Sequence, residues 1–148
     1  MQGHALGLAL RVYIEDTDAG GIVYYVNYLK YFERARTELM RALGFARAAL
    51  PEAGCQFVVH SMEVEYLRPA LLDDQLVAEA RIANTGRARI DFVQRVLRGA
   101  EELCRARIGI ACIDPVTRRP RALPAALRER LASTAGVDHT PTLTEIPT

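Results

Sequence analysis

The chain has 148 residues, of which 50% are hydrophobic and 25% are charged, with 19 basic residues against 18 acidic ones. This length is typical of one domain with a single core, and a net charge of +1 argues against a nucleic-acid-binding face. No apolar run is long enough for a transmembrane helix, and the N-terminal segment lacks the basic start of a signal peptide, so neither is expected.

The three cysteines, Cys55, Cys104 and Cys112, are odd in number and have no CxxC spacing. This pattern predicts free thiols in a reducing compartment, so we expect a cytoplasmic protein. No spacing of His, Cys and carboxylate residues is typical of a metal site, and the serine-hydrolase and phosphate-loop patterns do not occur. We therefore expect no metal and no separate cofactor.

The first element expected along the chain is a half-buried strand, because apolar residues alternate with small or polar ones from residue 6 to residue 14. The polar, glycine-containing run 15–21 follows it. Glycine adopts backbone angles that other residues avoid, so this run predicts a turn. The apolar face of the strand is predicted to carry Leu6, Leu8, Leu10, Val12 and Ile14.

A long helix is predicted next, capped by Asn27 and ending near Leu43, with Gly44 as its stop. Aromatic and aliphatic residues recur at helical spacing on the face that we expect to lie against a sheet. They are Tyr28, Tyr31, Phe32, Ala35, Leu39 and Ala42. The rest of the helix surface is assigned to Lys30, Glu33, Arg34, Arg36, Glu38 and Arg41.

Four further strands are predicted at residues 58–66, 76–82, 90–96 and 104–112, followed by a short helix at 124–131. The connections are short, which favours antiparallel neighbours. The order predicts an α+β fold, with one long helix against a five-stranded antiparallel sheet. Residues 1–132 are predicted to form a single domain, and 133–148 a disordered tail. The uncovered sheet edges predict a homo-oligomer.

The densest group of unusual residues is EDTDAGGIVYYVNY at 15–28. It has three carboxylates within four residues, then two glycines and three tyrosines. Backbone amides are free where a helix begins, so a carboxylate and an amide placed there could act together on a carbonyl group. The same residues also fit an ordinary turn and helix cap, and the residues alone leave both interpretations open.

The stretch RVYIEDTDAGGIVYYVNYLKYFERARTELMRALGF closely resembles the YbgC branch of the hotdog-fold acyl-CoA thioesterases, the family related to 4-hydroxybenzoyl-CoA thioesterase. The resemblance continues through VEYLRPALLDDQL and covers roughly residues 8–115. It implies a hotdog fold, in which a curved antiparallel sheet wraps around a long helix, with active sites at the interfaces of a dimer or tetramer. It also implies hydrolysis of acyl-CoA thioesters, with coenzyme A entering as part of the substrate.

By the same resemblance, Asp18 is the catalytic carboxylate, acting as a nucleophile or as a general base towards water, and the backbone amide near Tyr25 binds the thioester carbonyl. Family members commonly have His at the position of Tyr25 and Tyr at the position of Ile14. A tyrosine hydroxyl does not act as a base near neutral pH, so we expect chemistry centred on Asp18 without an imidazole. Substrate binding is assigned to Ile14, Gly21, Tyr24, Tyr28 and His60. The aromatic, apolar set favours a short aliphatic or an aromatic acyl group.

Coenzyme A carries phosphates, which arginine side chains bind well. Related thioesterases have basic residues in the turn where Arg87 and Arg89 follow Gly86, so these two are the predicted phosphate ligands, with Arg68 as a third. A solvated hairpin tip is the alternative interpretation of this turn. For His60 the alternative is a core or interface residue.

Three other functions compete with acyl-CoA hydrolysis. The acyl group could be carried by acyl carrier protein instead of free CoA. The loss of the usual His could instead mark a scaffold that binds acyl-CoA or proteins of the cell-envelope machinery without turnover. Hotdog dehydratases use a different Asp and His arrangement, and nothing in the chain matches it.

Overall fold

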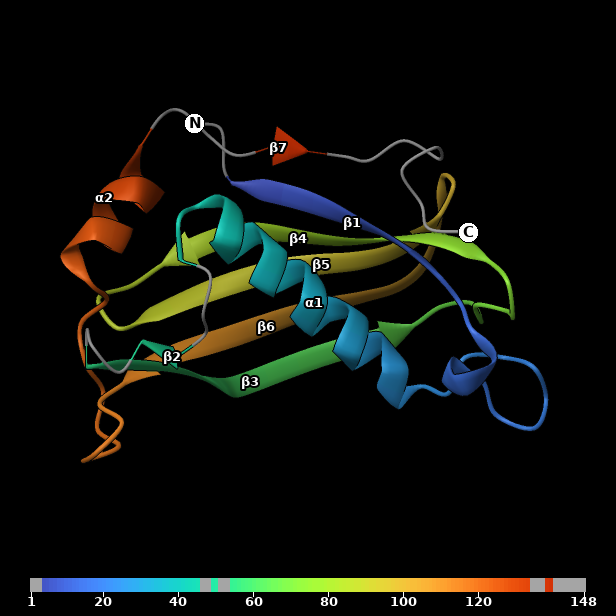
Figure 1. The fold of residues 1–148 in the computed structure, drawn as a ribbon, viewed down its shortest axis with the longest axis horizontal. Coiled ribbons are helices and arrows are strands. Elements are labelled where there is room, and N and C mark those ends of the chain that lie inside the picture. The colour runs from blue at the N-terminus through green and yellow to red at the C-terminus, as the bar shows by residue number, and fades with distance from the viewer. Residues whose placement is uncertain (1–3, 46–48, 51–53, 134–137, 140–148) are drawn as a thin grey trace.

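The computed structural model describes residues 4–45, 49–50, 54–133 and 138–139 (Figure 1). The predicted strands and helices follow one another along the chain in the predicted order, with one 3-10 turn, η1, before the long helix. The elements are β1 (Ala5–Arg11), η1 (Ile14–Asp16), α1 (Val26–Ala42), β2 (Ala49–Leu50), β3 (Cys55–Tyr66), β4 (Gln75–Thr85), β5 (Arg89–Arg98), β6 (Glu101–Ile113), α2 (Ala125–Ala132) and β7 (Asp138–His139).

The strands form one sheet in the order β2-β3-β6-β5-β4-β1-β7, and α1 lies across one face of it (Figure 1). The five long strands pair antiparallel with one another, which confirms the predicted α+β fold with a five-stranded antiparallel sheet and one long helix. The two-residue strands β2 and β7 at the sheet edges were not predicted, and β7 runs parallel to β1. Apart from Ser133 and β7, the predicted tail 133–148 lies outside the described residues.

The core lies between α1 and the sheet. Tyr31, Phe32 and Leu39 of α1 are almost completely buried, at the helical spacing that the sequence predicted. They belong to one cluster with buried side chains from the strands, such as Leu76 of β4 and Ile108 of β6. Burial of these large apolar side chains is the main stabilising contribution to the packing of helix on sheet.

The first strand ends earlier than predicted. Leu6, Leu8 and Leu10 face the core opposite β4, and Val12 is fully buried, as the alternation indicated. Ile14, however, lies in η1 and is 77% exposed, so its assignment to the buried face was wrong. The chain leaves the sheet at Val12 because the turn η1 bends it away, and the alternation of apolar residues does not reveal that bend.

The predicted apolar face of β3 was wrong in its first half. The pairing of β3 with β6 shifts by one residue between Val59 and Ser61, which is a β-bulge. Because one extra residue exchanges the two faces of a strand, Phe57 and Val59 line the space under α1 instead of Val58 and His60.

Among the described residues, no helix is long and apolar enough to cross a membrane.

Candidate active site

The loop between η1 and α1 holds Asp18 and the two glycines of the motif. Thr17 and Val23 form an antiparallel bridge, and the Asp18 amide donates a hydrogen bond to the Ile22 carbonyl at 2.9 Å. Gly21 closes this narrow turn with φ of +79°, a conformation that favours glycine. The turn is anchored to the segment that follows β3, since the Val23 amide donates to the Ala70 carbonyl at 2.9 Å.

Asp18 stands exposed at the start of this turn. Its Oδ1 accepts a hydrogen bond from the Gly20 amide at 2.8 Å, which fixes the orientation of the carboxylate. Among the described residues, no other hydrogen bond or ion pair involves this carboxylate, so its second oxygen, Oδ2, is available to a water molecule or a substrate.

Asp16, in contrast, holds the loop together. Its Oδ2 accepts a hydrogen bond from the Tyr13 amide at 2.9 Å, and its carbonyl accepts one from the Tyr24 amide at 2.9 Å. The same carbonyl accepts a second hydrogen bond, from Asn27 Nδ2 at 2.7 Å. The prediction that Asn27 caps the helix was therefore wrong, because α1 already begins at Val26 and the Asn27 side chain ties the helix to η1.

The first turn of α1 presents free backbone donors. The Asn27 and Tyr28 amides donate to the Tyr24 and Tyr25 carbonyls. Within the described part of the chain, the amides of Tyr25 and Val26 have no such acceptor. Free amides at a helix N-terminus carry a partial positive charge, so they can stabilise negative charge on an oxygen atom.

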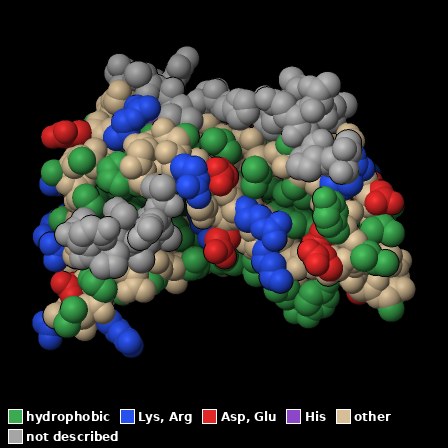
Figure 2. Space-filling view, in the orientation of Figure 1, with side chains coloured by type: hydrophobic (Ala, Val, Ile, Leu, Met, Phe, Trp, Pro, Cys, Tyr) green, Lys and Arg blue, Asp and Glu red, His purple; other side chains and the backbone are tan. Residues whose placement is uncertain are grey.

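An aromatic cluster surrounds this helix end. The Tyr25 ring packs edge-on against the Tyr66 ring with centroids 5.9 Å apart, and Tyr66 also contacts the Tyr28 ring at 5.6 Å. The Tyr66 hydroxyl donates a hydrogen bond to the Tyr25 carbonyl at 3.3 Å. Figure 2 shows hydrophobic side chains gathered at this end of α1, where Tyr24, Tyr25 and Tyr66 are exposed.

Tyr66 was not predicted as a site residue. It lies on β3, 41 positions from Tyr25 in the sequence, so only the fold brings the two residues together. Burial raises the pKa of both Tyr66 and Tyr28 above the usual tyrosine value. Both hydroxyls therefore stay protonated near neutral pH. The Tyr28 hydroxyl is already used, since it accepts a hydrogen bond from the Ala70 amide at 2.9 Å.

Of the other predicted site residues on or near β3, His60 lies apart from this cluster and Arg68 lies close to it. His60 sits in the β3 bulge on the sheet face opposite α1, because its ring lies against Gly109, between the inward-facing Ile108 and Ile110. Arg68 lies near Tyr66 at the end of β3, where it forms an ion pair with Glu101 at 3.1 Å.

Arg87 and Arg89 lie at the far end of the sheet from Asp18. The Arg87 carbonyl accepts a hydrogen bond from the Leu123 amide, close to α2, and Arg89 forms an ion pair with Asp91 at 2.9 Å. The 11 residues of β4 separate this turn from the Asp18 end. At about 3.3 Å per residue they span roughly 35 Å. One chain therefore does not bring these arginines to Asp18.

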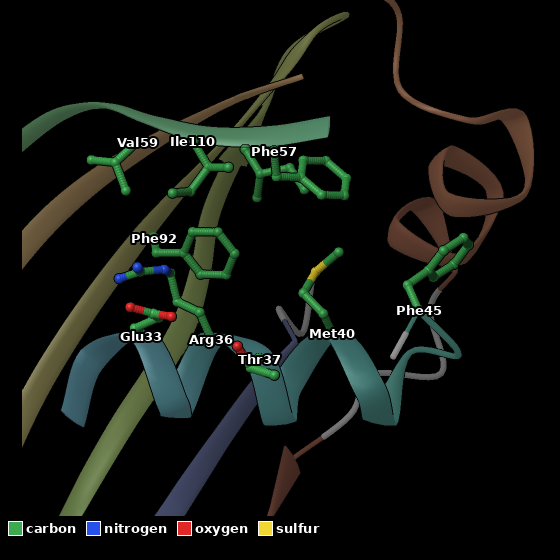
Figure 3. Close-up of a pocket in the computed structure, with 10 residues that line it drawn as sticks. Glu33, Arg36, Thr37, Met40, Phe45, Phe57, Val59, Phe92 and Ile110 are labelled. Atoms are coloured by element: carbon green, nitrogen blue, oxygen red, sulfur yellow. The ribbon is translucent and has the colours of Figure 1, made fainter. Parts of the chain in front are cut away.

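A cavity of about 180 Å³ lies between the C-terminal half of α1 and strands β3, β5 and β6 (Figure 3). It was not predicted, because its walls come from four separate elements. It is lined by Glu33, Arg36, Thr37, Met40, Phe45, Phe57, Val59, Ile90, Phe92 and Ile110.

Comparisons with known proteins place the chain in a family. Residues 12–131 match the family model of the thioesterase-like superfamily. The acyl-CoA thioester hydrolase YbgC of Escherichia coli O6:H1 is 42% identical over 119 residues, which are 80% of this chain and 89% of that protein. The acyl-CoA thioesterase YbgC of Haemophilus influenzae is 40% identical over 129 residues, covering 86% of this chain and 95% of that protein.

The chain belongs to the YbgC branch of the thioesterase-like superfamily. The crystal structure of a probable thioesterase from Bartonella henselae is 38% identical in sequence and superposes with a TM-score of 0.75. The match covers 83% of this chain and all of that chain. The predicted family, the hotdog fold and the assignment as a thioesterase are thereby confirmed.

Proposed function

We propose that this YbgC-type chain hydrolyses acyl-CoA thioesters to CoA and a carboxylic acid, with Asp18 as the catalytic carboxylate. The observation that carries the proposal is the position of Asp18, exposed on a rigid glycine turn just before the free amides of α1. The YbgC relatives at 40–42% identity are named as acyl-CoA thioester hydrolases, which supports this substrate class.

The Tyr25 amide, with Val26 beside it, binds the thioester carbonyl oxygen and stabilises the negative charge that forms there. As a general base, Asp18 takes a proton from water, whose oxygen attacks the carbonyl carbon while the carbon–sulfur bond breaks and CoA thiolate leaves. As a nucleophile, Asp18 attacks the carbon itself, the carbon–sulfur bond breaks and CoA thiolate leaves; water then hydrolyses the resulting mixed anhydride, which releases the carboxylic acid and restores the Asp18 carboxylate. The proposal includes both the general-base and the nucleophilic route, and neither uses a metal or a cofactor besides the CoA of the substrate.

The proposed assembly is a homodimer formed through the β3 edge. Within the described residues, only the two-residue strand β2 covers this edge, opposite Cys55 and Gln56, and the rest of the outer edge, on the side away from β6, has no strand beside it. Val59, Met62 and Tyr66 of β3 are exposed and apolar. A long, apolar and uncovered edge strand is a surface on which a second copy can add. A tetramer would be two such dimers.

The dimer would complete the site. In an antiparallel pair of β3 strands, the Tyr66 end of one copy lies beside the Phe57 end of the other. The Asp18 loop of one copy would then face the cavity under α1 of the other, since Phe57 and Val59 line that cavity. Substrate contacts at this junction are proposed for Ile14, Gly21 and Tyr24, which belong to the Asp18 loop or lie next to it.

The same geometry gives Arg87 and Arg89 a role. They lie at the far end of their own sheet, and an antiparallel dimer moves that end of one copy towards the Asp18 end of the other. Phosphate binding by Arg87 and Arg89 is therefore proposed across the interface, with Arg68 acting from the Asp18 side. His60, on the opposite sheet face, is proposed to contact substrate only if CoA passes over that face.

The cytoplasm is the proposed compartment. Cys55, Cys104 and Cys112 are free and buried. Burial raises the pKa of Cys55 and of Cys104 to about 12, which keeps these thiols protonated and unreactive. Free thiols of this kind are typical of a reducing compartment. Cell fractionation tests the assignment, which a periplasmic location would contradict.

A panel of short, long and aromatic acyl-CoAs tests the activity, with released CoA measured by a thiol-trapping reagent. We expect turnover with short aliphatic or aromatic members. The same acyl groups carried on acyl carrier protein are assayed in parallel. Faster turnover of that form would show that acyl carrier protein, and not CoA, is the carrier of the acyl group. Binding without CoA release across the whole panel would contradict the proposal and favour a non-catalytic scaffold.

A further inference from the structure

The cavity under α1 has an apolar side and a polar side. The side formed by the strands carries Phe57, Val59 and Phe92 among others, while Arg36 and Thr37 come from α1 (Figure 3). A dry apolar cavity of about 150 Å³ can hold benzene, so about 180 Å³ is enough for an aromatic ring or an aliphatic group of similar size.

Arg36 is held rigidly in the wall of this cavity. Its side chain is buried, with 9% of the residue exposed, and its Nη1 donates a hydrogen bond to Gln94 Oε1 at 2.9 Å. Gln94 is fully buried, and its Nε2 donates to the Phe32 carbonyl at 3.0 Å. The amide of Gln94 therefore has one orientation, and Arg36 is fixed by it.

The Arg36 guanidinium has donors to spare. An arginine side chain offers five N–H donors, and within the described part of the chain Arg36 uses one of them and joins no ion pair. Burial lowers the pKa of Arg36, while the charge of Glu33, which also lines the cavity, opposes that shift. A buried cation with few partners is unfavourable unless an acceptor reaches it, and the cavity is the side from which an acceptor can come.

We propose that this cavity holds the acyl group and that Arg36 selects acyl groups bearing an oxygen acceptor over hydrocarbon groups of the same size. The inference rests on the proposed thioester hydrolysis and narrows its substrate class. A hydroxyl or carbonyl oxygen on the acyl group accepts a charge-assisted hydrogen bond from the guanidinium. A hydrocarbon of equal volume fills the cavity but leaves the cation without that partner.

Ring-substituted benzoyl-CoAs test this selection, because a hydroxyl and a methyl substituent are nearly equal in size. Hydroxybenzoyl-CoA and methylbenzoyl-CoA are compared at the 2-, 3- and 4-positions in unmodified protein, Arg36→Met and Arg36→Lys. In unmodified protein we expect kcat/KM for the best hydroxyl isomer to exceed that of its methyl partner roughly tenfold or more, the effect of one charge-assisted hydrogen bond. The ratio should fall close to one in Arg36→Met and to an intermediate value in Arg36→Lys.

Arg41→Met is the matched control, since Arg41 is an exposed arginine of the same helix that pairs with Glu38 and does not line the cavity. It should keep the full ratio. Equal rates for all three pairs in unmodified protein would overturn the inference, as would a ratio that survives Arg36→Met. If Arg36→Met fails to fold, as judged by circular dichroism, the ratio in Arg36→Lys tests the inference: a lower ratio than in unmodified protein supports it and an unchanged ratio contradicts it.

A second measurement separates this inference from the proposed function. If no thioester releases CoA, the proposed hydrolysis is wrong. Calorimetric binding of the same hydroxyl and methyl pairs to the protein still tests the selection by Arg36. Tighter binding of a hydroxyl isomer that is lost in Arg36→Met and reduced in Arg36→Lys supports the selection. Equal binding within every pair contradicts it.

Discussion

Asp16 and Asp18 stand two residues apart and have different surroundings. Asp16 uses both its carboxylate and its carbonyl within the loop, towards Tyr13, Tyr24 and Asn27. Asp18 uses one oxygen on the Gly20 amide and keeps the other free. We therefore infer that Asp16 shapes the site and that Asp18 acts in it.

Asp16→Ala tests this division. The substitution leaves the Tyr13 amide without its acceptor, as at a lost helix cap, so we expect the free energy of unfolding to fall by about 1 kcal/mol. Urea denaturation followed by circular dichroism measures the loss. Asp18→Asn is the comparison and should unfold at nearly the same urea concentration. A larger loss in Asp18→Asn than in Asp16→Ala would reverse the assignment.

Tyr25→Phe should have a mild effect, because the proposed contribution of Tyr25 to catalysis is its backbone amide, which the substitution keeps. The phenylalanine ring can also keep the edge-on contact with Tyr66. We expect kcat/KM to stay within about tenfold of the unmodified value, less than the loss of a proton-transfer group. Steady-state assays on the best acyl-CoA measure this, and complete inactivity would mean that the hydroxyl takes part in the reaction.

At the scale of elements, β3 and β6 fit together through a glycine. A Cβ added at Gly109 would lie 2.5 Å from Ser61 Oγ and 2.9 Å from His60 Nε2, so the bulge in β3 depends on the small residue in β6. Gly109→Ala should lower the free energy of unfolding by about 1–3 kcal/mol through overpacking. Thermal unfolding measures it, and Ser61→Ala in the same protein should restore part of the loss. A Gly109→Ala protein as stable as the unmodified one would show that the bulge adapts freely.

The elements also mark where sequence reasoning reached its limit. Periodicity located the end of α1 to within one residue and its start to within two, because its apolar stripe is long and regular. It assigned Arg36 to the solvated surface, since spacing cannot show that Gln94 of β5 covers this position. It misplaced Val58 and His60 because a one-residue bulge leaves no trace in the alternation.

At the scale of the whole molecule, much of the candidate site depends on distant contacts. The motif pointed to Asp18 and Tyr25 because both lie in one short stretch, whereas Tyr66 and the cavity arise only when β3 packs beside α1. Arg87 and Arg89 were predicted from a turn, and one chain leaves them at the far end of the sheet. A single sequence does not reveal which surface meets a second copy.

Disruption of the β3 edge tests the proposed dimer. Met62 is 38% exposed, lies in the part of β3 that β2 leaves uncovered and does not line the cavity under α1. Met62→Glu places a charge on this edge, so we expect a shift from dimer to monomer and a loss of thioesterase activity. Light scattering after size exclusion measures the mass. Ala126→Glu, at an exposed position of α2, is the control and should change neither. An active monomer would contradict the shared site.

The most direct test of the account is CoA release by Asp18→Asn on the best acyl-CoA of the panel, with Glu15→Gln as the control from the same acidic run. Asparagine keeps the size of the side chain and an oxygen for the Gly20 amide but removes the charge. We expect turnover to fall on the order of 100-fold or more, with unchanged thermal unfolding, because the catalytic carboxylate is lost. Glu15→Gln should retain its activity. Unmodified turnover in Asp18→Asn would contradict the account.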